Sequence, residues 1–520
     1  MDRPRSRDVR IALLNFGQQF SADASRLLAS LLKGEGHEVR LVFLPKERRG
    51  VFRRERFVYE GYSAGEVEAL LALLEDRDAV FASLLSTHSV RGLQLLRQLR
   101  TRFQGPLVLG GIHPTVCPEP SAQAAHWICR GEGEEAVLEI AQLLERGKSL
   151  ETVENVGYWR RGRLHLNELR PLARDLDALP YSDYLLEDDW VLDNGRFARV
   201  TESLLVEKHV NWGFGLPTYC ILASRGCPLH CTYCYNSAFL STYGPGPLRF
   251  MSAERTVDEI EEALKNHPSL ERVFFCDDDF FARPQENLKE LCSLYKERVA
   301  VPFRCEASAR TLTRDKLDCA LEAGLRSVEL GLQSGSERIR RDVYRRPETH
   351  KMLWEAAHLL HEATATHGLA IDYDVLVNNP YETVEERLET PLFLSRIPRP
   401  FRINVFSVIP FPGTEWREML LRDGFIGEDP GAYNRNYIDL FHSDMRWTSL
   451  VLLCQSEAPW LLPGPVFRAC MRIARRPWSD KIAGWIGRFL GRWGLPFFFE
   501  LWTAKTYLAY RWRCRKRRLA

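Results

Sequence analysis

Three cysteines lie within eight residues near the middle of the chain, in the stretch RGCPLHCTYC at positions 225–234. The spacing places Cys227, Cys231 and Cys234 in one short loop, and cysteine thiolates are the ligands that hold iron–sulfur clusters. A cubane cluster with only three protein ligands keeps one iron open to substrate, whereas a structural metal site is closed by a fourth ligand. The alternative is structural zinc with Cys220 or His230 as that ligand. Cys220 lies in a predicted strand and His230 is adjacent to Cys231, so neither is well placed to complete a tetrahedron, and the spacing favours an iron–sulfur cluster.

The composition of the chain is that of a soluble globular protein, with 45% apolar and 27% charged residues. A length of 520 residues exceeds one ordinary core and predicts several domains. The net charge of +2 argues against a nucleic-acid partner, because proteins that bind nucleic acids usually present a broad basic face. Apart from the cluster loop the 13 cysteines are thinly spread, and the polar start of the chain does not resemble a signal peptide. We therefore expect a cytoplasmic protein whose thiols stay reduced.

Short apolar runs alternate with amphipathic helical patterns over residues 1–150, which we assign to a first domain. The predicted strands are Val9–Leu14, Glu38–Leu44, Ala79–Ser83, Pro106–Gly110 and His126–Cys129. Nearly continuous apolar strands that alternate with helices indicate a parallel sheet covered on both faces. The first domain is therefore expected to be a doubly wound α/β domain of the flavodoxin or Rossmann type, with its ligand crevice at the carboxyl ends of the strands.

Residues 151–216 break this pattern, and we expect a linker there that includes a hairpin at 156–166. A second β/α series then spans residues 217–424. Its predicted strands are Tyr219–Ala223, Arg272–Cys276, Pro302–Glu306, Ser327–Gly331, Ala370–Leu376 and Arg402–Ile409. Six β/α units of this spacing predict a partial (β/α)6 barrel with its site at the C-terminal ends of the strands. Residues 425–520 are expected to form a mainly helical C-terminal region that is rich in aromatic and basic residues.

The cluster stretch, with an aromatic residue before its last cysteine, resembles the signature of the radical S-adenosylmethionine (radical SAM) superfamily. Further segments that resemble this family follow at the ends of the predicted strands: Asp277-Asp278-Asp279, Glu306, the run ELGLQSG at 329–335, NPYET at 379–383 and PFPGT at 410–414. The resemblance implies that the three cysteines hold a [4Fe–4S] cluster, whose open iron binds S-adenosylmethionine. One electron then cleaves the cofactor and gives a 5′-deoxyadenosyl radical.

The resemblance also implies a set of residues that bind S-adenosylmethionine: Tyr233, Asp277, Asp278, Asp279, Glu306, Gln333 and Ser334. The fourth-strand segment of the family usually carries Glu before Ser, where this chain has Gln333. Taken alone, the carboxylate triplet is equally consistent with a helix cap, and the glycines of 329–335 with backbone turns. Their weight comes from their order and from their common position at strand ends.

The strand ends of the first domain carry small and hydroxyl residues, in the loops SLLSTH at 83–88, GGIHPT at 110–115 and GEGE at 131–134. Such residues let a large planar ligand approach the backbone. No GxGxxG follows the first strand, so a dinucleotide is not expected. The set resembles the cobalamin-binding domain that precedes many radical SAM proteins. The resemblance implies cobalamin contacts at Ser83, Ser86, Thr87, Gly110, Gly111, His113, Pro114, Gly131 and Glu132.

The DxHxxG motif of proteins that ligate cobalt through a histidine is missing from this chain. His88 and His113 are candidates for that ligand, although loop histidines more often pack or form hydrogen bonds. A domain that has lost cobalamin and acts as a scaffold is the alternative.

Residues 483–510 are rich in Trp, Phe, Leu and Tyr, and charged residues interrupt them too often for a membrane-spanning helix. Aromatic residues with scattered arginines, followed by a basic tail from Arg511 to Arg518, suit a helix at the inner face of a membrane. Packing against the barrel, with a solvated tail, explains the same composition equally well.

The tandem resemblance, of the class B methyltransferase type, implies a cobalamin-dependent radical SAM methyltransferase. We expect it to methylate an unactivated carbon of a small or lipid-like metabolite and to take its electron from a flavodoxin or ferredoxin. The alternatives are a non-methylating radical cyclisation, ring rearrangement or oxidation with the same cofactors, and a non-catalytic cobalamin or iron–sulfur sensor.

Overall fold

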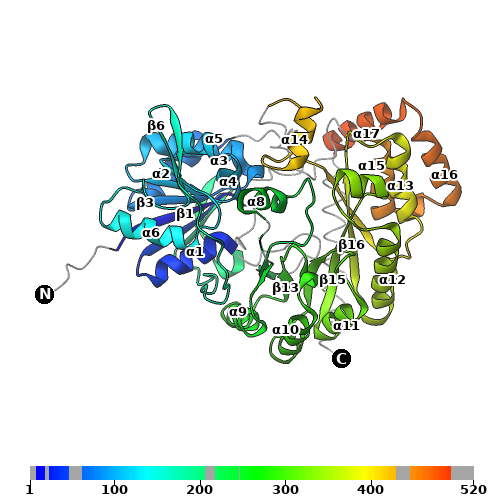
Figure 1. Cartoon of the computed structure of the whole chain (residues 1–520), viewed down its shortest axis with the longest axis horizontal. Coiled ribbons are helices and arrows are strands. Elements are labelled where there is room, and N and C mark those ends of the chain that lie inside the picture. The colour runs from blue at the N-terminus through cyan, green and yellow to red at the C-terminus, as the bar shows by residue number, and fades with distance from the viewer. Residues whose placement is uncertain are drawn as a thin grey trace.

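The computed structural model describes residues 8–17, 23–45, 61–204, 217–244, 246, 248–428 and 446–493. Two α/β bodies lie side by side, each built on a sheet, and the helix α8 (Tyr235–Tyr243) lies between them (Figure 1). The C-terminal helices cover the outer side of the second body.

The first sheet contains a core of five parallel strands in the order β5-β4-β3-β1-β2. This is the flavodoxin-like order, which confirms the predicted doubly wound fold. The strands are β1 (Arg10–Asn15), β2 (Glu38–Phe43), β3 (Ala79–Ser83), β4 (Leu107–Gly110) and β5 (Trp127–Cys129). Their side chains are apolar on both faces, because one face packs against α1 and α6 and the other against α2, α3 and α5. These helices, with the short α4, are α1 (Asp23–Gly34), α2 (Ala64–Leu74), α3 (Ser89–Arg102), α4 (Ile112–Val116), α5 (Pro118–Ala124) and α6 (Glu134–Glu145).

Residues 151–204 extend the first sheet at both of its edges. The expected hairpin, β6 (Val156–Arg160) with β7 (Arg163–Leu166), pairs antiparallel with β5. A second hairpin, β8 (Asp189–Asp193) with β9 (Arg196–Arg199), pairs with β2 and gives a sheet of nine strands. Sequence analysis missed the second hairpin, although its turn, Asn194-Gly195, has positive φ at both residues and is a strong hairpin signal.

The second sheet has six parallel strands in sequential order, which confirms the predicted partial barrel. The strands are β10 (Thr218–Ile221), β13 (Arg272–Phe275), β14 (Phe303–Ala307), β15 (Leu325–Gln333), β16 (Ala370–Val377) and β17 (Arg402–Ser407). A small antiparallel pair, β11 (Ser224–Arg225) with β12 (Arg249–Phe250), flanks the cysteine loop. The helices that cover the outside, with the following α14, are α9 (Ala253–Asn266), α10 (Gln285–Arg298), α11 (Arg314–Ala323), α12 (His350–His367), α13 (Val384–Leu394) and α14 (Glu415–Arg422). Only the face toward these helices is apolar, and it forms the largest core cluster.

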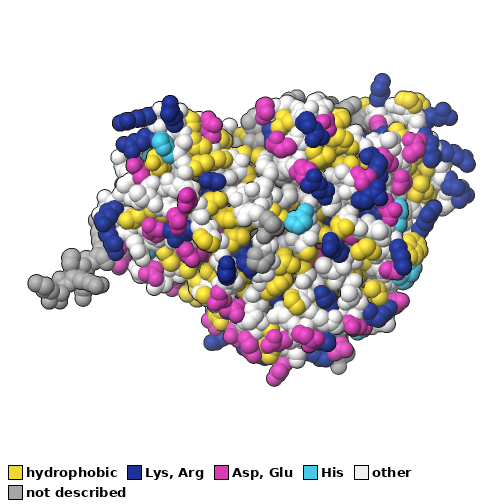
Figure 2. Space-filling view, viewed as in Figure 1, with side chains coloured by type: hydrophobic (Ala, Val, Ile, Leu, Met, Phe, Trp, Pro, Cys, Tyr) yellow, Lys and Arg dark blue, Asp and Glu magenta, His cyan; other side chains and the backbone are white. Residues whose placement is uncertain are grey.

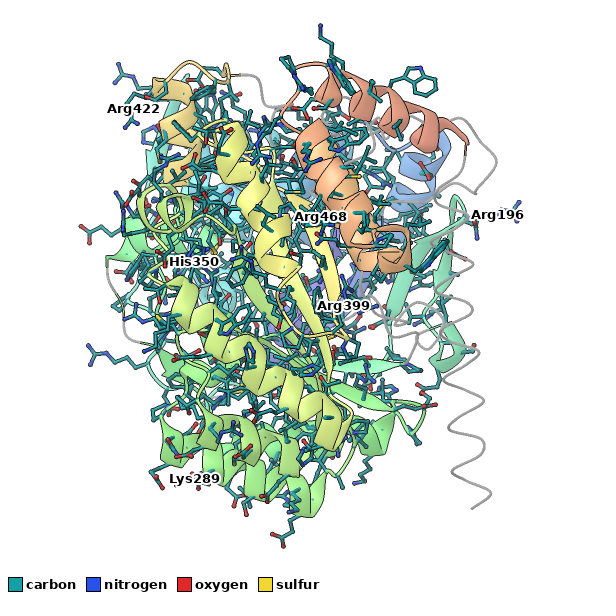
Figure 3. The ribbon with its side chains drawn as sticks, turned by 90° about the vertical axis from the view of Figure 1, so that its right-hand side faces the viewer. Arg196, Lys289, His350, Arg399, Arg422 and Arg468 are labelled. Atoms are coloured by element: carbon teal, nitrogen blue, oxygen red, sulfur yellow. The ribbon has the colours of Figure 1, made fainter. Side chains whose placement is uncertain are left out.

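The C-terminal region is helical in its described part. It contains α15 (Trp447–Glu457), α16 (Gly464–Ile473) and α17 (Ser479–Trp493). The helices α16 and α17 lie on the outside, beyond α13 and α15, and α16 carries Arg468 (Figure 3). The aromatic and basic segment predicted at the end of the chain lies outside the described residues from position 494 onward. Among the described helices, none has the length and apolar character that a membrane span requires.

Candidate active site

The cysteine loop occupies the C-terminal end of the first barrel strand, between β11 and α8. Cys231 is buried, and Cys227 and Cys234 are partly exposed. Burial raises the pKa of all three thiols, to about 12 for Cys234, and the charge of Cys231 raises the pKa of the other two further. The Cys231 thiol is thus within electrostatic range of both other thiols. Bound iron would instead favour the thiolate forms, so this donor set fits an iron–sulfur cluster.

Thr232 holds the middle of the loop in place. Its backbone N–H donates to the carbonyl of Tyr344 at 3.1 Å, and its hydroxyl donates to the carbonyl of Val343 at 2.8 Å. The carbonyl of Thr232 accepts from the N–H of Trp416 at 2.9 Å. Two segments that lie far away in the sequence therefore fix the positions of the neighbouring cysteines.

The described residues contain no group of three His, Cys, Asp or Glu side chains close enough to hold a single metal ion. A single zinc ion closed by Cys220 or His230 therefore has no ligand set in that part of the chain. A cubane cluster is larger than one ion, and its cysteine ligands accordingly lie farther apart.

The three aspartates after β13 have three different environments. Asp277 is fully buried and accepts from the N–H of Ser224 at 2.9 Å, with Arg283 at 3.5 Å. Asp279 is buried and accepts from the hydroxyls of Ser308 and Thr311. Asp278 alone is exposed to solvent, yet surrounding protein desolvates it and raises its pKa, while Asn236 and the backbone of Gly226 form hydrogen bonds with it.

A carboxyl that reaches solvent, but whose pKa is raised because surrounding protein desolvates it, lies in a recess rather than on an open surface. Because Gly226 precedes the first cluster cysteine, this recess adjoins the cysteine loop. Of the three aspartates predicted to bind S-adenosylmethionine, Asp278 is the one beside the cysteine loop.

Tyr233 belongs to a buried layer beneath the cysteine loop. Arg346 donates to the Tyr233 hydroxyl at 3.3 Å and to the carbonyl of Gly331 at 3.1 Å. The same guanidinium forms a bidentate pair with Glu348, at 2.7 and 3.3 Å. Tyr233 also packs edge-on against Tyr344, with ring centroids 5.0 Å apart. These contacts assign Tyr233 to the support of the loop.

Gln333 and Ser334 follow β15 at the barrel mouth. Gln333 has a φ of 65°, in the left-handed region, and its Oε1 is buried without a hydrogen-bond partner among the described residues. Ser334 is fully buried and donates to Glu382 at 3.3 Å, and burial raises the pKa of Glu382 to about 7. Gln333 therefore offers a polar atom to a ligand, whereas the Ser334 hydroxyl is engaged within the protein.

Glu306 lies on the inner face of the barrel, below the aspartate triplet. The alternation of β14 directs it there, because Phe303, Cys305 and Ala307 pack into the helix-side core. Burial and the neighbouring aspartates raise its pKa to about 7, against the opposing charge of Arg304.

The strand ends of the first domain form an edge of small residues. Ser83, Thr87, Gly110 and Gly111 are partly exposed there, and Pro114 is buried in α4. Gly111 has a φ of 99°, and a Cβ at this position would lie 2.8 Å from the Leu84 nitrogen. Gly111 thus lets two loops of this edge pack closely, and the small, partly exposed residues leave an edge that fits a large flat ligand such as cobalamin.

His113 is completely buried, and its Nδ1 lies 3.0 Å from the hydroxyl of Ser86. Burial lowers the pKa of His113 to about 4, so the ring is neutral. The buried pair of His113 and Ser86 supports the loop from below, whereas His88 is partly exposed.

Glu132 joins the two bodies. Its carboxylate pairs with Arg225 at 2.9 Å and with Arg249 at 2.8 and 2.9 Å, and Arg225 also pairs with Glu134 at 2.6 Å. Burial opposes ionisation of Glu132, but its bonds with these arginines lower its pKa. The Glu132 carboxylate, predicted to contact cobalamin, is therefore paired with residues of the radical SAM part of the chain. One of them, Arg225, lies two residues before Cys227.

The row Tyr235, Phe239 and Tyr243 on α8 fills the space beside this joint. A Cβ on Gly131 would lie 1.5 Å from the Tyr243 hydroxyl, so that tyrosine packs directly on the first domain. Phe239 lies on Tyr243 at 4.7 Å, and Tyr235 lies on Phe411 at 4.8 Å between ring centroids. A Cβ on Gly413 would meet Val116 at 2.8 Å, so the loop after the last barrel strand also reaches the first domain. The strand-end edges of the two sheets therefore face each other.

Several residues of this site escaped sequence analysis. Arg346 and Glu348 have no local signal, because their partners come from β15 and the cysteine loop. A local sequence signal was present for three others, Arg304, Asp374 and Asn404. Polar residues alternate with apolar ones in their strands, which indicates strands with one polar face.

Two family models match the chain. Residues 221–394 match the radical SAM superfamily, and residues 9–141 match the B12 binding domain. The chain therefore combines a B12-binding domain with a radical SAM domain. These domains imply a [4Fe–4S] cluster, S-adenosylmethionine and cobalamin.

Two curated relatives are methyltransferases by name. An uncharacterized methyltransferase of Pyrococcus horikoshii is 23% identical over 323 residues, which are 62% of this chain and 64% of the relative. The cytidylyl-2-hydroxyethylphosphonate methyltransferase of Streptomyces wedmorensis is 25% identical over 224 residues, which are 42% of this chain and 40% of the relative. The chain thus matches under two thirds of the length of either relative.

Two solved structures share the fold. The radical S-adenosylmethionine methyltransferase TsrM from Kitasatospora setae, with tryptophan substrate and a SAM analog bound, has a TM-score of 0.61 at 15% identity, covering 80% of this chain and 76% of that one. The cobalamin-dependent S-adenosylmethionine radical enzyme OxsB, with aqua-cobalamin and S-adenosylmethionine bound, has a TM-score of 0.62 at 15% identity, covering 93% and 72%.

Proposed function

We propose that this chain is a cobalamin-dependent radical SAM methyltransferase that methylates an unactivated carbon of a small or lipid-like metabolite. The observation that carries the proposal is the meeting of the two strand-end edges, where Arg225 next to the cluster loop pairs with Glu132 and Glu134 of the B12-binding domain. Reacting groups must be held near contact distance, and opposed edges provide that arrangement.

When bound, the cluster supplies the electron that cleaves S-adenosylmethionine, and cobalamin supplies the methyl group. Cys227, Cys231 and Cys234 hold the cluster. In the recess beside this loop, Asp278 accepts hydrogen bonds from the amino group of S-adenosylmethionine. The aromatic row on α8 closes the space between the two edges to solvent, because oxygen, reductants and weak hydrogen donors that enter with solvent would quench a radical.

The decisive experiment is anaerobic reconstitution of the full chain with iron, sulfide and cobalamin, followed by reduction with flavodoxin or ferredoxin. The protein is incubated with methyl-labelled S-adenosylmethionine and a metabolite extract from a strain that lacks the gene. We expect 5′-deoxyadenosine and a labelled small molecule.

The two products separate the alternatives. Formation of 5′-deoxyadenosine without labelled product would support a radical cyclisation, ring rearrangement or oxidation in place of methylation. Absence of 5′-deoxyadenosine from cluster-loaded, reduced protein would favour the non-catalytic sensor and refute the enzyme proposal.

We further propose that α16 and α17 contact an anionic membrane surface. Trp460, Trp478 and Trp485 are 77%, 49% and 62% exposed, which is unusual for tryptophan. Lys and Arg side chains gather over these helices at the right-hand edge of Figure 2. Basic residues outnumber acidic ones in this part of the sequence: it holds Arg468, Arg472, Arg475, Arg476 and Lys481 against Asp480. Exposed aromatic residues among cations are typical of interfacial helices.

Vesicle sedimentation tests this contact. We expect binding to vesicles of phosphatidylglycerol and phosphatidylcholine, weaker binding at high salt, and loss on joint replacement of the three tryptophans by serine. Trp354→Ser on α12, which removes a 37% exposed tryptophan elsewhere, is the matched control. Equal binding to purely zwitterionic vesicles would contradict the proposed role of charge.

A further inference from the structure

Arg130 directly follows β5, at the edge of small residues that fits cobalamin. The register of the sheet pairs Leu109 of β4 with Ile128 of β5, so the loop at 110–115 runs beside the loop that Arg130 begins. Both loops belong to the set that the sequence predicts for cobalamin. Arg130 itself is not among the predicted contacts, and its position between the two loops is a result of the fold.

Hydrogen bonds fix the backbone on both sides of Arg130. Its N–H donates to the carbonyl of Asn155 at 2.9 Å, and the side-chain amide of Asn155 donates to the carbonyl of Glu132 at 2.7 Å. Asn155 is itself buried. The N–H of Gly131 donates to the hydroxyl of Thr115 at 2.9 Å, which joins the two loops. Arg130 therefore extends from a backbone that two other segments hold in place.

The guanidinium of Arg130 has no hydrogen bond or ion pair with any described residue. Its Nε is buried without a partner, whereas its two terminal nitrogens reach the surface. Burial lowers the pKa of Arg130, and the Tyr243 hydroxyl, rather than a carboxylate, is the group that opposes this effect. A partly desolvated cation without an anion is costly, so this side chain has unfilled bonding capacity.

The carboxylates nearest in the sequence are already matched by other arginines. Glu132 pairs with Arg225 and Arg249, and Glu134 pairs with Arg225. Two carboxylates thus face two guanidinium groups, and neither carboxylate is left for Arg130. The edge therefore carries an excess positive charge at this position.

The chemistry of cobalamin indicates which of its groups would meet this charge. The side chains around its corrin ring end in neutral amides, whereas its nucleotide tail contains a phosphodiester, the one anionic group of its periphery. An arginine forms charge-assisted and often bidentate hydrogen bonds with phosphate oxygens. An unpaired guanidinium at this edge is thus complementary to the phosphodiester rather than to the amides.

We propose that Arg130 binds the phosphodiester of the cobalamin nucleotide tail. The inference rests on the cobalamin of the proposed function and uses no step of methyl transfer. A phosphate ester of the substrate is the other possible source of the same chemistry. Arg130 belongs to the B12-binding domain and to its cobalamin loops, which favours the cofactor, and the experiment below separates the two sources.

Binding of cobalamin and of cobinamide to the full chain tests the assignment without turnover. Cobinamide keeps the corrin ring and lacks the phosphodiester with its nucleotide, and the corrin absorbance reports both ligands in equilibrium dialysis. We expect Arg130→Met to weaken binding of cobalamin at least about tenfold and binding of cobinamide less than about twofold. Arg130→Lys keeps the charge and should retain part of the affinity for cobalamin.

Two controls exclude a general loss of structure. Arg97→Met removes an exposed arginine of α3 that has no ion pair among the described residues, and it should change the affinity for neither ligand. Because the Arg130 guanidinium forms no bond with described residues, Arg130→Met should also leave the midpoint of urea unfolding unchanged.

Unchanged affinity of the Arg130→Met variant for cobalamin, or equal weakening of both ligands, would overturn the assignment. Loss of turnover with intact cobalamin affinity would assign Arg130 to a phosphate of the substrate and would overturn it as well. Either result is compatible with labelled methyl transfer by the wild type. Conversely, absence of methyl transfer with an intact, Arg130-dependent preference for cobalamin would refute the proposed function and leave this assignment standing.

Discussion

The two sheets of this protein differ in the polarity of their faces. The strands of the B12-binding domain, such as RIALLN and AVFAS, are apolar toward both layers of helices. The strands of the radical SAM domain, such as FRCEA and AIDYDVLV, are apolar on the helix side and charged on the other. The first sheet therefore has room for a ligand at its strand-end edge alone, whereas the second can hold one at its edge and inside its curve.

This difference gives the cofactors and the substrate separate places. Cobalamin fits the edge of small residues, and the cluster fits the cysteine loop at the opposite edge. In the proposed function, the polar interior of the barrel is left for the substrate. Arg225 and its two glutamates join the edges, so they couple the two regions.

The largest effect is expected from a substitution in the cysteine loop, at the strand-end edge of the radical SAM domain. Cys231→Ala removes one of the three proposed cluster ligands, and we expect loss of the cluster absorbance and at least a ~1,000-fold loss of 5′-deoxyadenosine formation. Cys470→Ala, which removes a partly exposed cysteine of α16, should change neither measurement. Persistent cofactor cleavage by the Cys231 variant would refute the cluster assignment.

The next largest effect is expected from a substitution at the contact between the two domains. Arg225→Met leaves Glu134 without its guanidinium and weakens the set around Glu132, all of them at most 17% exposed. We expect the free energy of unfolding in urea to fall by about 2–3 kcal/mol. The matched control is Arg102→Met, which breaks an exposed, solvent-screened pair with Glu68 and should leave the free energy of unfolding nearly unchanged. Equal losses in the two variants would show that the joint carries no special weight.

A pair of neighbouring residues on β15 sharpens the contrast between the faces. Val328 is fully buried in the helix-side core, so Val328→Ala should lower the free energy of unfolding by about 2 kcal/mol. Ser327 is equally buried on the inner face but has no hydrogen-bond partner among the described residues, so Ser327→Ala should change stability by less than about 0.5 kcal/mol. Thermal and urea unfolding measure both, and a large loss for Ser327→Ala would reveal a bond to the hydroxyl.

The smallest effect concerns pH. The folded pKa of Glu306, about 7, lies above the value near ~4.3 of an unfolded chain, so the folded state loses stability as pH rises from 4 to 7. Glu306→Gln removes this loss. The variant should be more stable than the wild type by about 1–2 kcal/mol at pH 8, and by none at pH 4. Parallel stability curves for the two proteins would contradict a desolvated Glu306 carboxyl with a raised pKa.

Much of the fold was predictable because its signals are local. The strands of both sheets were placed from short apolar runs, and the cysteine loop from its spacing. The hairpin β8–β9 was missed although its Asn-Gly turn was visible. The different environments of Asp277, Asp278 and Asp279 were not predictable, because each depends on partners from other elements: Ser224, Asn236 and Ser308.

The sequence by itself determined which chemistry the chain carries. Three cysteines within eight residues stay close together whatever the rest of the fold, so their spacing alone predicts a shared metal site. It also determined the two β/α series that present this loop. The tertiary structure decided where that chemistry is directed. It pairs Arg225 with Glu134, 91 positions away, and it brings Glu306 to the same inner face as Asp374. Such pairings depend on strand order, sheet curvature and the docking of two bodies, and these long-range contacts leave no trace in local spacing.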